Sequence, residues 1–130
     1  MKKIPLLTKT VFHASNIGLI LIYLYPGSIF GWLLYGNTQK QPQLTPDFII
    51  FSSNHVYAFV LLTSLGGFSF HNTKKINFLI IYLFLLSIIL ELFHIIIPVR
   101  GFEMSDLLGN IVGVILVIFI YKIVISYVKT

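Results

Sequence analysis

The chain has 130 residues, of which 57% are hydrophobic and only 10% are charged, and its mean hydropathy is +0.94. A soluble domain of this length needs more polar groups to cover its surface, so the composition predicts a membrane protein with several spans. The absence of cysteine excludes disulfides, thiolate nucleophiles and cysteine-ligated metals. Because most lysines flank apolar segments, the net charge of +5 indicates membrane orientation rather than nucleic-acid binding.

A basic start followed by an apolar run predicts a first transmembrane helix over about residues 6–25. Secretory signal peptides open in the same way, but no small-residue cleavage site follows this run. Pro26 and Gly27 are expected to end the helix. The aromatic segment 29–35 is predicted to lie at the outer membrane interface, and the polar segment 36–44 is predicted to be an exposed loop.

A second helix is predicted over about residues 45–70. Thr45 is expected to be its N-cap, with Pro46 at the first helical position and Asp47 near the positive end of the helix dipole. The early turns are unusually polar for a membrane span and include His55. At a rise of 1.5 Å per residue, His55 is expected roughly 15 Å below the outer end of this helix.

Two further helices are predicted over about residues 76–97 and 105–127. Pro98 is expected to end the third helix. Ser105 is expected to cap the fourth helix, with Asp106 in its first turn.

Glycines in two of the predicted helices indicate close helix packing. Gly109 and Gly113 in the fourth helix have the small-xxx-small spacing that lets helices approach each other. The pair Gly66-Gly67 near the end of the second helix either admits a neighbour or loosens the helix.

The predicted fold is therefore all-α, with one domain over residues 1–130 and four transmembrane helices in a small antiparallel bundle. The lysines predict its orientation by the positive-inside rule. Most of them lie in segments that this topology places on one side: Lys2, Lys3, Lys9, Lys74, Lys75, Lys122 and Lys129. The opposite loops contain only Lys40 and Arg100, so both termini are predicted to be cytoplasmic.

Polar residues of the last three predicted helices are expected to meet at a similar depth in the outer leaflet. Glu91 and His94 are three residues apart, and Asp106 and Asn110 are four apart, so each pair lies on one helix face. Exposing such groups to lipid would cost on the order of several kcal/mol for each group. We therefore expect them to face inward and to satisfy one another, together with His55.

The arrangement of these residues resembles that of the VanZ-like family of membrane proteins. In that family an acidic residue near the end of the third helix precedes a loop arginine and an Asp-x-x-x-Asn start to the fourth helix. The matching positions, with the family's histidine early in the second helix, are Glu91, Arg100, Asp106, Asn110, Gly113 and His55. The resemblance covers about residues 54–121. It implies a multi-pass protein of the bacterial cytoplasmic membrane, connected in some members with glycopeptide (teicoplanin) resistance.

The chain departs from the family pattern at two places. Phe51 and Ser52 stand where the family often has Asp-Lys, which weakens any role that needs a second outer carboxylate. His94 stands where the family commonly has Gln, and it adds a candidate metal ligand or base.

The candidate site residues divide by chemistry. The candidate catalytic acids or bases are Glu91, His55 and Asp106, and the binding candidates are Arg100, Asn110 and His94. The weaker metal-ligand candidates are His55, Glu91 and His94. The same pattern also fits a hydrogen-bonded network that only holds the helices together. Arg100 can either hold a phosphate or pair with Glu103 or Asp106.

The expected function is binding of an anionic membrane lipid or lipid-linked envelope precursor in this outer-leaflet site, with or without modification of the bound molecule. The alternative is a non-catalytic structural subunit of a larger membrane complex, which predicts a membrane protein partner. Neither interpretation involves nucleic acid, and the sequence identifies no cofactor.

Overall fold

The computed structural model describes residues 3–129, and this part of the chain forms five α-helices and no named β-strand. The helices are α1 (Lys3–Leu24), α2 (Ile29–Tyr35), α3 (Ser53–Phe70), α4 (Ile76–Phe93) and α5 (Met104–Lys129). The all-helical class predicted from the sequence is therefore confirmed.

Three of the described helices are long and apolar enough to cross a membrane. Their candidate spans are Pro5–Leu24 in α1, Ile76–Phe93 in α4 and Met104–Val128 in α5. Helix α3 is as long as α4, with 18 residues each, but its first turn carries Ser53, Asn54 and His55. Because these polar residues lower its mean hydropathy, α3 is not one of the three candidate spans.

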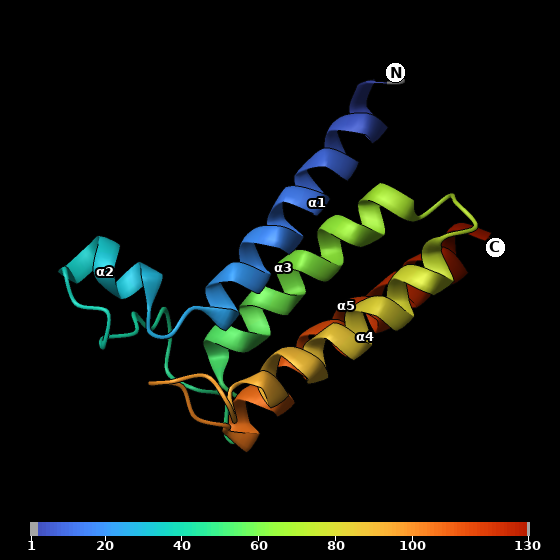
Figure 1. Ribbon diagram of the computed structural model, residues 1–130. Helices are drawn as coiled ribbons and strands as arrows, with labels where there is room; N and C mark the ends of the chain where they lie inside the picture. Colours follow the sequence, from blue (N-terminus) through green and yellow to red (C-terminus); the bar gives the residue numbers. More distant parts are fainter. Residues whose placement is uncertain (1–2, 130) are drawn as a thin grey trace.

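Helix α3 is the central helix of the molecule. It contacts α1, α4 and α5, and these four helices lie alongside one another, whereas the short α2 stands apart from them (Figure 1). The fully buried Phe59 of α3 packs in the core with Leu83 of α4 and Val114 of α5. The start of α1, the turn between α3 and α4 and the end of α5 all lie at one end of the molecule (Figure 1).

The glycines of α5 let α3 pack closely against it, as their spacing predicts. A Cβ atom on Gly113 would lie 2.8 Å from both the Phe59 Cβ and the Val56 carbonyl oxygen. A Cβ atom on Gly109 would lie 2.7 Å from the Ser52 carbonyl oxygen. Both distances are too short for a side chain, so contact between these backbones requires glycine at each position.

The prediction that a helix begins at Thr45 is wrong, because α3 begins at Ser53. Residues 45–52 instead form a tight turn, in which Phe48 and Phe51 exchange backbone hydrogen bonds and Ile49 has a φ of 53°. The Asp47 carboxylate accepts a hydrogen bond from the Ser53 N–H at 3.1 Å. Asp47 does therefore serve the positive end of a helix, but from the preceding turn and not from within the helix.

The later start of α3 changes the predicted position of His55. This residue lies in the first turn of α3 and not about ten residues into a longer helix. The estimate of roughly 15 Å below the helix end is therefore wrong, since at 1.5 Å per residue His55 lies within the first turn.

Smaller differences occur at the other helix ends. Helix α1 ends at Leu24, before Pro26, while α4 ends at Phe93 and a turn takes the place of its predicted last residues. Helix α5 begins at Met104, and the Glu103 carbonyl accepts the first intrahelical bonds, so the predicted Ser105 cap is wrong.

Helix α2 was not predicted as a helix. The Ser28 hydroxyl accepts a hydrogen bond from the Gly31 N–H at 2.9 Å, which caps the start of the helix. Gly36, with a φ of 64°, ends it in the left-handed conformation that glycine favours.

Candidate functional site

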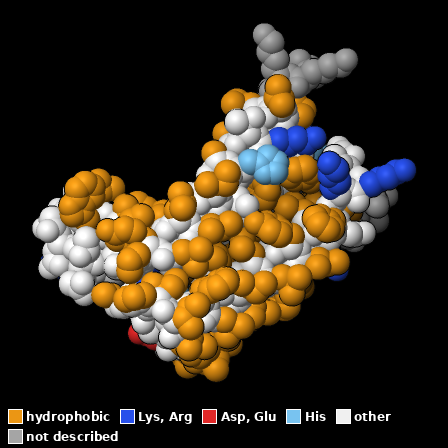
Figure 2. Space-filling model, in the orientation of Figure 1, with side chains coloured by type: hydrophobic (Ala, Val, Ile, Leu, Met, Phe, Trp, Pro, Cys, Tyr) orange, Lys and Arg blue, Asp and Glu red, His pale blue; other side chains and the backbone are white. Residues whose placement is uncertain are grey.

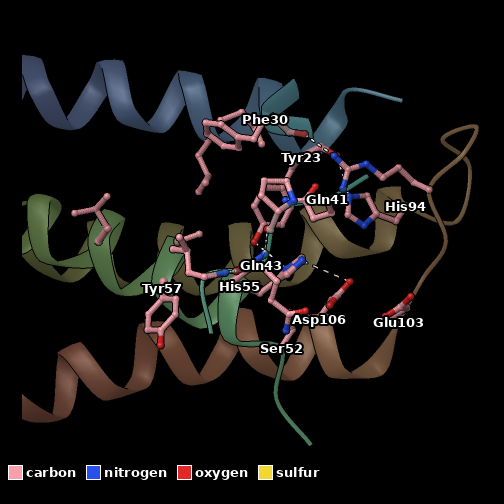
Figure 3. A pocket seen from close by; sticks show the side chains of 18 of the residues that line it. Tyr23, Phe30, Gln41, Gln43, Ser52, His55, Tyr57, His94, Glu103 and Asp106 are labelled. Atoms are coloured by element: carbon pink, nitrogen blue, oxygen red, sulfur yellow. Dashed lines mark hydrogen bonds and ion pairs between the residues drawn. The ribbon is translucent and has the colours of Figure 1, made fainter. Parts of the chain in front are cut away.

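Polar side chains from four helices meet at the end of the molecule opposite the two termini. They are Tyr23 of α1, His55 of α3, Glu91 of α4, and Asp106 and Asn110 of α5. Glu91 and Asn110 are completely buried, and Tyr23 is 5% exposed. In Figure 3, His55 and Asp106 point toward each other, and Tyr23 and His94 lie above this pair.

Asn110 orients the imidazole of His55. The Asn110 amide nitrogen donates to the Ser87 carbonyl at 3.0 Å, which directs the amide oxygen toward α1 and α3. That oxygen accepts a hydrogen bond from the Tyr23 hydroxyl at 2.7 Å and lies 2.9 Å from His55 Nδ1. The Tyr23 hydroxyl oxygen also lies 2.9 Å from His55 Nδ1. Because the amide oxygen can only accept and the Tyr23 proton is directed at that oxygen, these contacts favour a proton on His55 Nδ1.

The other imidazole nitrogen of His55 faces the Asp106 carboxylate. His55 Nε2 lies 3.5 Å from Asp106 Oδ2. Potential ligand atoms of His55, Glu91 and Asp106 all lie within 4.8 Å of one another. In the neutral Nδ1–H tautomer, Nε2 presents its lone pair to this group.

Glu91 is held between His94 and the loop that precedes α5. Glu91 Oε1 accepts a hydrogen bond from the Glu103 N–H at 3.2 Å. Glu91 Oε2 lies 3.1 Å from His94 Nδ1, but it has no hydrogen-bond donor with favourable geometry. The carboxylate is therefore only partly satisfied in a fully buried position.

His94 lies just after α4 and contacts α1. Its Nε2 donates to the Tyr23 carbonyl at 2.8 Å, and its ring stacks on the Tyr23 ring. Burial lowers the pKa of His94, but the adjacent Glu91 carboxylate and the Tyr23 carbonyl outweigh this effect and raise it above its usual value. His94 is therefore held between the Tyr23 carbonyl and the Glu91 carboxylate.

Arg100 joins the loop after α4 to the end of α1. Its Nε and Nη2 groups donate to the carbonyls of Ile22, Tyr25 and Gly27 at 2.6–3.1 Å. The Ile22 carbonyl belongs to the last turn of α1, and the other two carbonyls follow it. A cation at this position also meets the negative end of the helix dipole. In the described structure Arg100 forms no ion pair with Glu103 or Asp106, which was one of the two alternatives for this residue.

A cavity of about 990 Å³ opens beside this cluster. Its polar end is lined by His55, His94, Arg100 and Asp106, and by glutamines of the loop before α3. Its apolar side follows α1 and α3 and is lined by residues that include Leu19, Ile22, Ala58, Leu61 and Leu62. The cavity is therefore amphipathic, and Figure 3 shows its polar residues from close by.

The structure brings together most of the residues that the sequence singled out. His55, Glu91, Asp106 and Asn110 lie in one cluster, with His94 beside Glu91. The group of candidate metal ligands contains Asp106 where the sequence suggested His94. Arg100 stands at the rim, turned toward α1.

The role of Tyr23 was not predicted from the sequence. Its hydroxyl contacts Asn110 and His55, but the residue is uncharged and belongs to no motif that would indicate this role. A tyrosine near the end of an apolar helix is typical of the membrane interface. Only its alignment with His55 and Asn110 in space distinguishes it.

No family model matches this chain, and no curated protein or solved structure matches it either.

Proposed function

We propose that the protein is a VanZ-like protein of the bacterial cytoplasmic membrane that binds an anionic lipid or lipid-linked envelope molecule in the amphipathic cavity. The observation that carries the proposal is the cavity, because it joins an apolar side to a polar end that contains Arg100. An acyl or polyprenyl chain would lie along α1 and α3, and a phosphate group would lie at the polar end.

Arg100 supplies the donors for the anionic group. Its Nε and Nη2 groups bond to carbonyls of the α1 end, whereas the two N–H groups of Nη1 are not used by these bonds. A guanidinium that is already fixed on one side loses little freedom when its other side binds a phosphate oxygen. His94 lines the same polar end of the cavity.

The orientation in the membrane follows from where charge gathers. In this proposal α1, α3, α4 and α5 cross the membrane as an antiparallel bundle, with both termini in the cytoplasm. The lysine and arginine side chains visible in Figure 2 gather at the end that contains the termini, and an acidic side chain lies at the other end. This distribution supports the proposed orientation by the positive-inside rule, and in that orientation the cavity would lie in the outer leaflet.

The test is binding of a polyprenyl phosphate, compared with the matching polyprenyl alcohol, to the purified protein in detergent by native mass spectrometry. We expect the phosphate to bind more tightly than the alcohol. Ala58→Phe should weaken binding of the phosphate by about tenfold or more, since the ring would occupy the apolar side of the cavity.

Ala14→Phe is the matched control, because Ala14 is exposed on α1 and does not line the cavity. Equal binding of the phosphate by the two variants would refute lipid binding in this cavity. Equal binding of phosphate and alcohol would refute recognition of the anionic group.

A further inference from the structure

The cluster of His55, Glu91 and Asp106 has the composition of a cation site. One imidazole nitrogen and two carboxylates come from three different helices, and their potential ligand atoms lie within 4.8 Å of one another. Ligands of a tetrahedral zinc ion at about 2.1 Å are about 3.4 Å apart, so shifts of less than about 1 Å would complete the site.

The hydrogen bonds around His55 prepare its Nε2 atom for a metal. Ser87 fixes the Asn110 amide, and the amide oxygen in turn favours a proton on His55 Nδ1. Metal-binding histidines usually donate their second N–H to such an acceptor, which fixes the tautomer and the ring orientation. Here the acceptor is buried and has its own partners.

Glu91 provides an independent indication of a bound ligand. Its side chain is completely buried, and although Oε2 lies 3.1 Å from His94 Nδ1, it has no hydrogen-bond donor with favourable geometry. A second carboxylate, from Asp106, faces the same group. Two carboxylates in a buried site repel each other unless a proton or a cation lies between them.

We propose that His55 Nε2, together with one oxygen each of Glu91 and Asp106, binds a divalent transition-metal ion such as zinc. Nitrogen and oxygen ligands without sulfur suit this class of ion. Three protein ligands leave further coordination positions, and these would face the cavity that His55 and Asp106 line. The site is a proposal separate from lipid binding, because the metal alone is sufficient to test it.

A salt bridge is the competing explanation of the same geometry. If His55 were doubly protonated, it would pair with Asp106 at the observed 3.5 Å and would need no metal. The two explanations predict different metal contents: one ion per chain for the metal site, and none for the salt bridge.

The test is titration of the metal-free protein, purified in detergent, with Zn²⁺ by calorimetry, and with Co²⁺ by visible absorption. We expect about one ion per chain, with a Co²⁺ spectrum typical of nitrogen and oxygen ligands. His55→Gln and Asp106→Asn should each weaken metal binding by about a hundredfold or more, because each removes a direct ligand. Loss of a residue that only orients a ligand already lowers metal affinity by about 10–100-fold.

Matched controls are His71→Gln in the turn before α4 and Glu103→Gln in the loop before α5, because both side chains are exposed and lie outside the cluster. Helical circular dichroism establishes that each variant is folded. Glu91→Gln is a weaker test, because a substitution at this buried position can abolish metal binding by preventing folding. The proposal is overturned if the folded wild type binds no ion, or if binding by His55→Gln equals that by His71→Gln.

Discussion

Asn110 shows how one buried side chain can organise the chemistry of several others. It bonds to the Ser87 carbonyl with its nitrogen, and its oxygen meets Tyr23 and His55. Each of these residues comes from a different helix, so the amide links all four long helices at one depth. A buried network that is fully satisfied in this way specifies one arrangement of the helices.

Tyr23→Phe is expected to lower the free energy of unfolding by about 1 kcal/mol. The substitution removes one hydroxyl from a buried network while the ring keeps its place, and Asn110 retains its bond with His55. Unfolding in a mixed detergent, followed by circular dichroism, measures the change. Tyr35→Phe on the exposed α2 serves as the control, and an equal effect of the two substitutions would contradict the role given to Tyr23.

Helix packing depends on where glycine allows backbones to meet. Gly113 lies against Phe59 and Val56 of α3, whereas Gly67 of α3 has open space where its Cβ would be. Close contact between α3 and α5 keeps His55 near Asp106 and Asn110. The geometry of the site therefore depends on a small residue in α5, one turn from Asn110.

Gly113→Ala is expected to destabilise the protein by about 1–3 kcal/mol, because the new methyl group would meet two atoms of α3 at 2.8 Å. Gly67→Ala is expected to be neutral or to stabilise the helix by up to about 1 kcal/mol. The two variants insert the same methyl group, and thermal unfolding in detergent compares them. Similar melting temperatures for both would show that α3 and α5 are not in close contact at Gly113.

The topology of the whole molecule determines which side of the membrane the cavity faces. The proposed orientation places the loop between α2 and α3 outside and the turn between α3 and α4 inside. The natural chain has no cysteine, so a single introduced thiol reports the position of one residue.

Gln39→Cys in the outer loop is expected to react with a membrane-impermeant maleimide in intact cells, and Asn72→Cys in the inner turn is expected to react only after the membrane is opened. Both side chains are exposed in the folded protein. Labelling of both thiols in intact cells would show that α3 does not cross the membrane. The reverse pattern would place the cavity on the cytoplasmic side.

Local composition was sufficient to predict the helical class and three long apolar helices. Apolar runs bounded by Pro26, Lys75 and Pro98 leave the backbone little alternative in a membrane, where each segment must satisfy its own hydrogen bonds. The short helix α2 and the start of α3 could not be predicted in the same way. Their ends depend on contacts such as that of Asp47 with the Ser53 N–H, and a turn or a longer helix fits the local sequence equally well.

The polar residues of the cluster were recognisable in the sequence because charge is rare in this chain and costly in lipid. The pairs within this set, such as His55 with Asp106, were also expected. The partners outside it were not, since Arg100 bonds to carbonyls at the end of α1 and Asn110 bonds to Tyr23 and Ser87, all far away in the chain. Spacing along one helix shows which residues share a face. Which face of another helix lies opposite depends on packing, and in this protein the contact of Gly113 with α3 sets that packing.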